Sequence, residues 1–457
     1  MTDTVYDMVI LGAGSGGYAA ALRGAQLGLR VALIEADKIG GTCLHRGCVP
    51  TKAILHSAET AEAVREAAAV GVRAAYQGLD MPAVQRYKNG VISRMYKGLQ
   101  GLVASRGIEV VGGWGRLLAR DTVEVSGRRY RGRNIVLASG SLSKTMGQEI
   151  SGPVMTSDQV LELDRVPASA VVLGGGVIGV ELASAWASMG SRVTIIEALP
   201  HLVPNEDEAI SKQLERAFRK RRIAFRTSTM FESVERTAAG VTVRTADGRT
   251  HDAEVLLIAV GRGPATANLG YEEVGVAMDR GFVLTDDYGR TNVEGVWAVG
   301  DIVPGVQLAH RGFAQGIAVA EKIAGLDPRP VDDALVPKVT FCEPEIASVG
   351  LSEARAAELH GAENVTTSEF NVAGNAKSQI LGTQGFVKLV SLKGGPIVGF
   401  HAIGARMGEQ VGEGQLIVNW EADADDVAAL VHAHPTQNET LGEAAMALAG
   451  KPLHNHG

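Results

Sequence analysis

Cysteine is scarce in this sequence, and so are the features of exported or membrane-bound chains. Only three cysteines occur among 457 residues, too few for the disulfide framework of a secreted protein. The first apolar run has no basic segment before it, which argues against a signal peptide, and no run is long enough to span a bilayer. We therefore expect a cytoplasmic protein without membrane contact, whose thiols stay reduced unless they have a chemical role.

Excess positive charge is absent too. The chain carries 44 basic and 51 acidic residues, a net charge of −7, which argues against a nucleic-acid-binding surface. A hydrophobic content of 46% and a charged content of 21% are ordinary for a folded protein, and the length predicts about three domains. We therefore expect a multidomain globular protein that does not bind nucleic acid.

Glycine, by contrast, is abundant, and many of the 57 glycines stand in an internal repeat. Segments 11–35 and 173–197 align without gaps, and 11 of their 25 positions are identical. Each follows an apolar run and contains glycines in G-x-G-x-x-G spacing, an alanine-rich helical pattern and a β-rich run that ends in glutamate. This order of strand, glycine turn, helix and strand is typical of a dinucleotide-binding unit. Two copies predict two dinucleotide sites; the alternative is that one copy is vestigial.

Each glycine of the motif has its own physical role. The first permits the tight turn from strand to helix, the second lets a pyrophosphate approach the backbone, and the third allows the helix to pack closely on the strand. The helix N-terminus then offers free N–H groups to the diphosphate. In the two copies these glycines are Gly12, Gly14 and Gly17, and Gly174, Gly176 and Gly179.

An acidic residue closes each copy. Glu35 and Glu197 each follow the third glycine by 18 residues, where a carboxylate accepts hydrogen bonds from ribose hydroxyls. Because a carboxylate repels the 2′-phosphate of NADP, Glu197 predicts NAD at the second site. Arg192 lies earlier on the same predicted strand and is not positioned as a phosphate clamp.

Two of the three cysteines stand together in the stretch GGTCLHRGCVPTK, residues 40–52. A zinc site needs two more cysteine or histidine ligands, but His45 is the only such neighbour within the stretch, so we expect no metal. Pro50 fits the first turn of a helix, which places Cys48 at or just before the helix N-terminus. The helix dipole stabilises a thiolate there, and Cys43 precedes it on a glycine-rich turn. These features favour a pair that is oxidised and reduced over a structural staple.

The stretch resembles the active-site motif of the flavin-dependent pyridine nucleotide–disulfide oxidoreductases. Over essentially its whole length, the chain is most similar to the dihydrolipoamide dehydrogenase branch of that family. The resemblance implies that Cys43 is the exposed thiol that exchanges with the substrate and that Cys48 faces the flavin. It also implies that Lys52 lies near the flavin ring and pairs with Glu181 beside the nicotinamide.

The stretch HAHPTQNE near the C-terminus holds a second candidate pair. Pro435 breaks any helix through His434, and we expect a helix from Thr436 that carries Glu439 in its first turn. The carboxylate can then fold back onto the imidazole, fix its tautomer and raise its basicity. The resemblance implies that this histidine completes the active site of the other subunit in a homodimer.

The remaining cysteine and histidines have simpler interpretations. Cys342, in a predicted strand, is expected to be a small buried apolar residue. His432 is expected to be structural, and His454 and His456 are expected to belong to the tail.

The resemblance assigns FAD to the first dinucleotide fold and NAD to the second. Asp301 ends the strand pattern VWAVGD and matches the residue that bonds the ribitol chain of FAD, while Gln315 stands where the family often has glutamate. The other residues matched to cofactor binding in the family, besides the glycines and glutamates above, are Thr42, Lys52, Gly115, Ser139, Gly140, Ser141, Leu308, Ala309, His310, Ile178, Glu181 and Gly261.

We therefore expect an α/β protein with two Rossmann-like dinucleotide-binding domains and a C-terminal α+β interface domain. The predicted segments are 1–148 and 266–334 for FAD, 149–265 for NAD, and 335–457 for dimerisation. The resemblance implies an oxidoreductase acting on sulfur groups in cell redox homeostasis, which oxidises protein-bound dihydrolipoamide and reduces NAD⁺. Its expected partner is the lipoyl-carrying acyltransferase of a 2-oxo acid dehydrogenase complex or the carrier protein of glycine cleavage. The alternatives are another disulfide or quinone reductase of the family, and a nucleotide-binding subunit without turnover.

Overall fold

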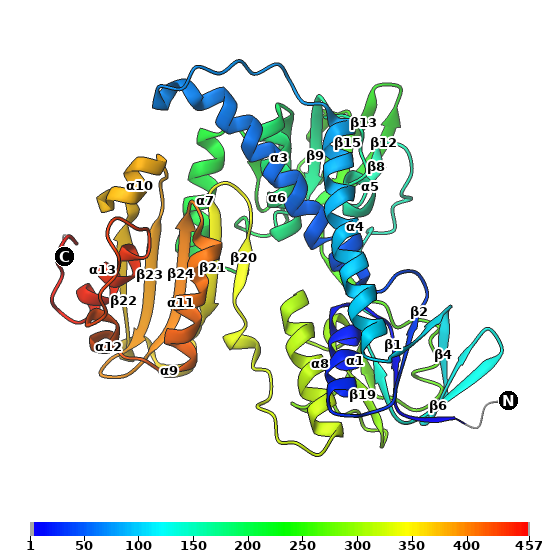
Figure 1. The fold of residues 1–457 in the computed structure, drawn as a ribbon. Coiled ribbons are helices and arrows are strands. Elements are labelled where there is room, and N and C mark those ends of the chain that lie inside the picture. The colour runs from blue at the N-terminus through cyan, green and yellow to red at the C-terminus, as the bar shows by residue number, and fades with distance from the viewer. Residues whose placement is uncertain (1–3, 456–457) are drawn as a thin grey trace.

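The structure is a computed structural model, and residues 4–455 are described. It consists of three regions, each built on one main sheet (Figure 1). The N-terminal region combines the blue start of the chain with the yellow-green segment around α8, and the green region lies above it in Figure 1. The C-terminal region, yellow to red, stands to one side of both.

The first region is a seven-stranded sheet. Strands β3, β2, β1, β6 and β19 run parallel, and β5 and β4 extend the sheet antiparallel from the first half of β6. The strands are β1 (Val5–Leu11), β2 (Val31–Glu35), β3 (Glu109–Gly112), β4 (Gly115–Ala119), β5 (Thr122–Val125), β6 (Arg128–Leu137) and β19 (Val296–Ala298). Helices α1 (Ser15–Gln26) and α8 (Ala309–Ile323) pack on it. Because β1 is buried along most of its length, it reads as an apolar run rather than an alternating pattern.

The second region repeats this architecture with five parallel strands in the order β11, β10, β9, β15, β8. An antiparallel three-stranded sheet, β12–β14, lies beside it. The strands are β8 (Val154–Met155), β9 (Ser169–Leu173), β10 (Arg192–Ile196), β11 (Ala224–Arg226), β12 (Phe231–Thr237), β13 (Gly240–Thr245), β14 (Thr250–Ala253) and β15 (Val255–Ile258). The helices are α5 (Ser157–Val160), α6 (Val177–Met189) and α7 (Glu208–Lys220).

The chain crosses between these two regions twice, and the crossings lie side by side. Strand β7 (Ser141–Ser143) leaves the first sheet and β16 (Arg262–Pro264) returns to it, and the two pair antiparallel. The pairing ties the end of each nucleotide fold to the other. A short hairpin, β17 (Met278–Asp279) and β18 (Phe282–Val283), follows the return crossing.

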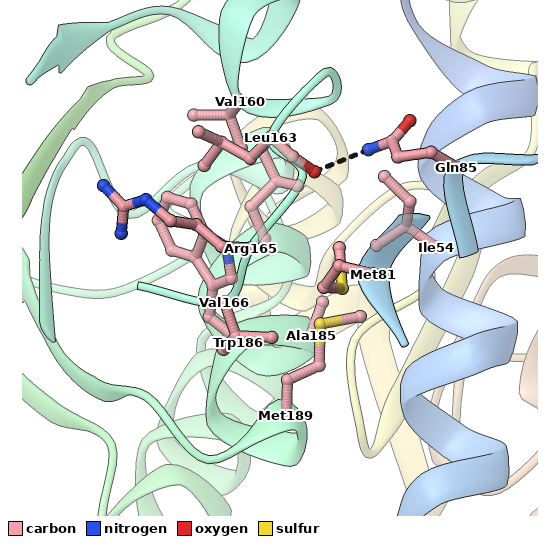
Figure 2. A pocket seen from close by; sticks show the side chains of 11 residues that line it. Ile54, Met81, Gln85, Val160, Leu163, Arg165, Val166, Ala185, Trp186 and Met189 are labelled. Atoms are coloured by element: carbon pink, nitrogen blue, oxygen red, sulfur yellow. Dashed lines mark hydrogen bonds between the residues drawn. The ribbon is translucent and has the colours of Figure 1, made fainter. Parts of the chain in front are cut away.

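Two long helices also join the regions. Helix α3 (Cys48–Glu66) packs on α6, and α4 (Met81–Ser105) runs from the second region down to the first (Figure 1). On α4, Gln85 donates to the backbone oxygen of Leu163 over 2.7 Å, beside an apolar seam that includes Ile54 and Trp186 (Figure 2). The fully buried Lys88 donates to the Leu161 backbone oxygen over 2.8 Å. The relative position of the two nucleotide folds is therefore held by both apolar packing and buried hydrogen bonds.

The third region is an antiparallel five-stranded sheet in the order β20, β21, β24, β23, β22. Helices α11 and α13 pack on it around a separate apolar core. The elements are β20 (Lys338–Thr340), β21 (Glu345–Gly350), β22 (Val365–Asn371), β23 (Phe386–Leu392), β24 (Ile397–Gly404), α9 (Glu353–His360), α10 (Ala376–Leu381), α11 (Met407–Asn419), α12 (Ala424–Ala428) and α13 (Glu439–Leu448).

The predicted fold class, two Rossmann-like folds and a C-terminal α+β region, is confirmed. Three local predictions are wrong. Helix α13 begins at Glu439 rather than Thr436, Cys43 lies in a short helix, α2 (Gly41–His45), and Cys342 lies between β20 and β21. Among the described residues, none of the helices combines the length and hydropathy needed to cross a membrane.

Candidate active site

The glycine turns of the two nucleotide folds have matching geometry. Gly12 and Gly174 have φ values of 105° and 99°, a conformation that residues with a Cβ rarely adopt. A Cβ on Gly17 would overlap the carbonyl oxygen of Gly12, and one on Gly179 would overlap that of Gly174. Only glycine therefore allows α1 and α6 to begin this close to the strands before them.

The N-termini of α1 and α6 are open toward the surface. Their N-cap residues, Gly14 and Gly176, supply no side-chain cap, and a Cβ at either position would meet no atom within 4 Å. The first backbone N–H groups of each helix are thus left for an external acceptor. Such a cradle fits a diphosphate, which the helix dipole also favours.

The acidic residues that close the two repeats are held in equivalent ways. Glu35 accepts hydrogen bonds from the backbone N–H groups of Ala13 at 2.8 Å and Asp37 at 2.9 Å. Glu197 accepts them from Gly175 at 2.6 Å and Leu199 at 2.7 Å. Each carboxylate is therefore fixed beside its glycine turn, where the predicted ribose contact requires it.

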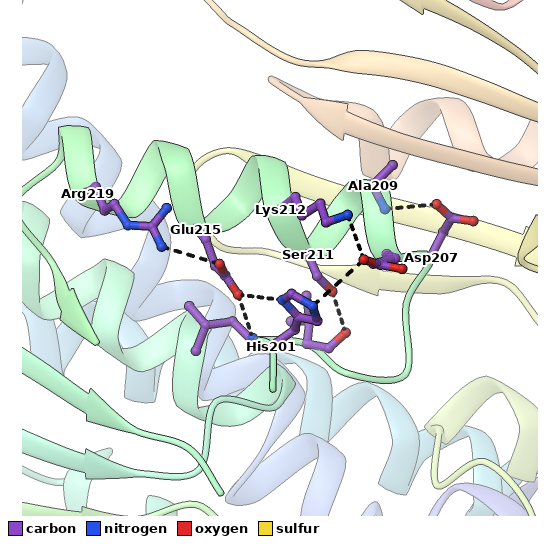
Figure 3. Close-up of polar contacts among 10 residues, drawn as sticks. His201, Asp207, Ala209, Ser211, Lys212, Glu215 and Arg219 are labelled. Carbon is purple, nitrogen blue, oxygen red and sulfur yellow. Dashed lines mark hydrogen bonds and ion pairs between the residues drawn. The ribbon is translucent and has the colours of Figure 1, made fainter. Parts of the chain in front are cut away.

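A polar cluster supports the loop that follows Glu197 (Figure 3). His201 Nδ1 lies 3.1 Å from Glu215 on α7, and its Nε2 lies 3.9 Å from Glu208. The Val203 N–H donates to the Gly175 oxygen over 2.8 Å, which ties the loop back to the glycine turn. Arg192 pairs with the start of β9, so it lies at the opposite end of β10 from Glu197, as expected.

A second polar group surrounds Asp301, which lies in a short 3₁₀ turn after β19. Ser141 donates to the Asp301 carboxylate over 2.5 Å, and Arg262 donates to the Ser141 hydroxyl over 2.7 Å. Gln315 on α8 accepts from the N–H of Gly300 at 2.8 Å, so this amide supports the turn that carries Asp301. The predicted residues Asp301 and Ser141, 160 positions apart, are thus brought together.

The remaining predicted cofactor residues lie in the first fold, at the crossings or, for Ile178, at the start of α6 in the second fold. Ser139 accepts from Tyr271 at 3.0 Å, and Gly115 is buried so closely that a Cβ would strike Leu11. Leu308 is the N-cap of α8, followed by Ala309 and His310, whose ring Nε2 lies 2.7 Å from the Pro337 oxygen. Thr42 lies in α2, Ile178 in the first turn of α6, and Gly140 and Gly261 at the two crossings.

Cys43 and Cys48 are free thiols that hydrogen-bond to one another. Cys48 is the first residue of α3, as predicted. It is the more exposed of the two, so the expectation that Cys43 is the exposed thiol is wrong: Cys43 lies within α2, whereas Cys48 lies at the open start of α3. The hydrogen bond from Cys43 lowers the pKa of the Cys48 thiol to about 7, and Lys52 acts in the same direction against the effect of burial. The same hydrogen bond raises the pKa of Cys43. The pair therefore holds its negative charge on Cys48.

Lys52 makes the predicted pair with Glu181. Its Nζ lies 2.9 and 2.8 Å from the two carboxylate oxygens, and Glu181 is buried within α6. Phe341, which the sequence did not indicate, completes this group: its backbone N–H donates to Glu181 over 2.8 Å, and its ring lies 4.6 Å from the Lys52 Nζ. Three regions of the chain thus meet at one buried carboxylate.

His434 and Glu439 form the predicted pair: Nδ1 of the histidine lies 2.8 Å from a carboxylate oxygen. The second oxygen of Glu439 accepts from the Thr436 N–H at 2.8 Å. Burial would raise the pKa of the Glu439 carboxyl, but the Thr436 and His434 hydrogen bonds outweigh it and lower that pKa. The histidine is 72% exposed, so its other nitrogen is accessible from outside the chain.

The other cysteine and histidines fit their simpler interpretations. Cys342 is buried, and burial raises its pKa well above the ordinary value. His432 bonds to Glu413 at 2.8 Å and is largely buried. His454 bonds to the buried Glu443 at 2.7 Å, whereas His456 lies outside the described residues. No cluster of three or more histidine, cysteine or acidic side chains that could hold a metal occurs between residues 4 and 455.

Comparison with known proteins identifies a family to which two nucleotide folds and a thiol pair belong. The family model "Pyridine nucleotide-disulphide oxidoreductase" matches residues 6–316, and the model of its dimerisation domain matches residues 336–445. The chain belongs to this family. It is therefore an oxidoreductase, and the C-terminal region is a dimerisation domain.

The similarity to individual relatives extends over nearly the whole length of this chain and of theirs. Dihydrolipoyl dehydrogenase of Bacillus subtilis is 37% identical and covers 99% of both chains. The crystal structure of LpdA from Mycobacterium tuberculosis matches 96% of this chain and 99% of its own with a TM-score of 0.90 and 27% identity. The HOCl-induced flavoprotein disulfide reductase RclA of Escherichia coli covers the same shares with a TM-score of 0.86 and 27% identity.

Proposed function

We propose that the protein catalyses the dihydrolipoyl dehydrogenase reaction, in which a dihydrolipoyl group is oxidised to the cyclic disulfide and NAD⁺ is reduced. The observation that carries the proposal is the thiol pair at the start of α3, with Cys48 held as the more acidic thiol next to the Lys52–Glu181 pair. The curated relatives named for this activity match the chain over its full length.

The two nucleotide folds fit FAD and NAD. The open helix N-termini suit diphosphates, and the fixed carboxylates of Glu35 and Glu197 suit ribose hydroxyls. We assign FAD to Gly12, Gly14, Gly17, Glu35 and Asp301, and NAD to Gly174, Gly176, Gly179 and Glu197. When bound, FAD would supply an acceptor for the electron pair of the reduced thiols, and NAD⁺ would supply the final acceptor. Lys52 places a cation next to Cys48, the thiol from which the electrons leave.

The thiol chemistry follows from the chain's own residues. A substrate thiolate attacks the sulfur of Cys43 in the oxidised pair, which breaks the Cys43–Cys48 bond and releases Cys48 as a thiolate. The second substrate thiol then attacks the mixed disulfide, closes the lipoyl ring and releases Cys43. The substrate loses two electrons, and the cysteine pair holds them. The low pKa of Cys48 makes it the better leaving group.

His434 serves as the base that removes the substrate thiol proton. The imidazole is oriented by Glu439, whose carboxylate oxygen lies 2.8 Å from Nδ1. Figure 1 shows the red segment around α12 and α13 on the outer side of the C-terminal sheet, whose strands lie between it and α3. We therefore propose that each His434 acts at the thiol pair of the other subunit in a homodimer.

The partner implied by the proposed function stays a prediction. A lipoyl group swings on a carrier, so the expected partner is a lipoyl-carrying acyltransferase or the glycine cleavage carrier protein. The predicted domain boundaries and the cytoplasmic location also stay predictions. The rival function is reduction of another disulfide or a quinone with NADH; the oriented His434–Glu439 pair favours a thiol substrate, because a quinone provides no thiol proton to remove.

An anaerobic assay tests the proposal. Adding dihydrolipoamide to the purified, FAD-loaded protein should produce long-wavelength absorbance from the Cys48 thiolate against the flavin, and NAD⁺ should then yield NADH. Dihydrolipoamide should exceed glutathione as a substrate by orders of magnitude in kcat/KM. If dihydrolipoamide produces neither the absorbance nor NADH, while NADH reduces a quinone quickly, the quinone reductase function holds instead.

A further inference from the structure

We propose that Phe341 is a positioning residue of the redox centre: its ring and its backbone N–H hold the Lys52–Glu181 pair next to Cys48. The inference rests on the proposed function only in naming Cys48 as the thiol that passes electrons onward. Phe341 belongs to the segment between β20 and β21 of the dimerisation domain, a region that carries none of the nucleotide motifs.

The contacts of Phe341 reach both members of the pair. Its N–H donates to Glu181 Oε1 over 2.8 Å, the same oxygen that lies 2.9 Å from Lys52 Nζ. Its ring lies 4.6 Å from that Nζ, within the range of a cation–π contact. Glu181 is 3% exposed, so its charge depends on these two donors, whereas the Lys52 side chain is 34% exposed and needs neighbours to keep it in one place.

The segment that presents Phe341 is itself fixed along α6. The Glu343 N–H donates to the Ser184 hydroxyl over 3.0 Å, one turn of α6 beyond Glu181. Arg221 clamps the same place, donating to the Ser184 hydroxyl over 2.7 Å and to the Glu343 oxygen over 2.8 Å. Cys342 is buried between Phe341 and Glu343, the two residues that bond to α6. These bonds hold the backbone of Phe341 against α6, next to the Lys52–Glu181 pair.

This arrangement has a chemical consequence at the thiol. Lys52 stabilises the Cys48 thiolate, and it does so only while its ammonium stays near the sulfur. Without the aromatic ring, the ammonium loses an attractive surface on one side and can turn toward solvent. Phe341 thus links the seating of the dimerisation domain to the acidity of Cys48.

The test compares Phe341→Leu with the wild type. The FAD-loaded protein is reduced with dithiothreitol, and the rate of iodoacetamide labelling at Cys48 is followed against pH by peptide mass spectrometry. The midpoint should move upward by about 0.5 to 1 pH unit in Phe341→Leu, because the thiolate loses part of its cation. Phe341→Tyr keeps the ring and should return the midpoint to within about 0.2 unit of the wild type.

Phe370→Leu is the matched control, since Phe370 is a buried aromatic in the separate apolar core of the same domain. A midpoint in Phe341→Leu equal to that of the wild type, or an equal shift in Phe370→Leu, would overturn the proposal. If Phe341→Leu does not fold, Phe341→Met takes its place, with the same shift expected. Because the assay uses neither lipoyl substrate nor NAD⁺, its outcome is separate from success or failure of the proposed function.

Discussion

At the scale of single residues, the chemistry depends on where two charges are placed. Cys48 begins a helix and receives a hydrogen bond from Cys43, and both features favour a thiolate. Glu439 divides its two oxygens between His434 and the Thr436 N–H, so the imidazole is held in one tautomer. Each arrangement predicts a change in behaviour with a single substitution.

The acidity of Cys48 should depend on its neighbour Cys43. With the pKa of Cys48 at about 7, the thiolate predominates above neutral pH, whereas an ordinary cysteine needs a pH near 9. We expect Cys43→Ala to raise the midpoint of iodoacetamide labelling of Cys48, and Cys43→Ser, which keeps a hydroxyl donor, to leave it nearer to 7. The buried Cys342 should stay unlabelled in both. Equal midpoints in the two variants would contradict the hydrogen bond as the cause.

Loss of the Glu439 carboxylate should impair the thiol half of the reaction alone. In Glu439→Gln the imidazole loses the carboxylate that orients it, so kcat/KM for dihydrolipoamide should fall by about 10- to 100-fold. Reduction of an artificial acceptor by NADH does not require a base for a thiol, and should stay within about twofold of wild type. A parallel loss of both activities would indicate a structural effect instead.

At the scale of elements, the repeat makes two sites whose failures should be separable. The third glycine of each motif sits where a Cβ would overlap a carbonyl oxygen, so alanine must push the helix away from the strand. The geometry of this glycine is the same in both copies, but we assign FAD to the first copy and NAD to the second.

We expect Gly17→Ala to lower the flavin content of the purified protein, and Gly179→Ala to leave the flavin in place while raising the KM for NAD⁺ by roughly tenfold or more. Flavin absorbance and steady-state kinetics measure the two effects. Gly98→Ala, on the exposed part of α4 where a Cβ meets no atom within 4 Å, is the control and should change neither. Loss of flavin in Gly179→Ala would contradict the assignment of the sites.

Local signals in the sequence predicted the elements well, and distant contacts less well. The repeat predicted both glycine turns and both carboxylates, because strand, turn and helix are encoded within 25 residues. The Lys52–Glu181 pair spans 129 residues and followed only from family resemblance. Phe341 was missed because a backbone N–H leaves no trace in the sequence. The predicted start of α13 was wrong. The side chain of Glu439, the first residue of the helix, accepts a hydrogen bond from the Thr436 N–H, so the residues before Glu439 form a turn.

At the scale of the whole molecule, the account requires two chains. The base and the thiols lie on separate regions, and the C-terminal region is a dimerisation domain. A shared site predicts complementation. Cys43→Ser and His434→Gln variants are each expected to be nearly inactive, but a heterodimer of the two contains one site with an intact Cys43 and an intact His434.

Co-expression of the two variants with different affinity tags should therefore restore roughly a quarter of the wild-type activity in a random mixture, and about half in purified heterodimers. The mixture of two separately purified variants, assayed before exchange, is the control and should stay inactive. If purified heterodimers are as inactive as the parents, each chain uses its own histidine, and the shared site is wrong.

The central claim is that the Cys43–Cys48 pair and a flavin together form one redox centre, and an anaerobic reductive titration tests it most directly. We predict that the oxidised, FAD-loaded wild type takes up four electrons per chain, two in the disulfide and two in the flavin, and that Cys48→Ser takes up two. Long-wavelength absorbance should appear at the halfway point in the wild type and be absent from the variant. Uptake of only two electrons by the wild type, with no such absorbance, would contradict the account.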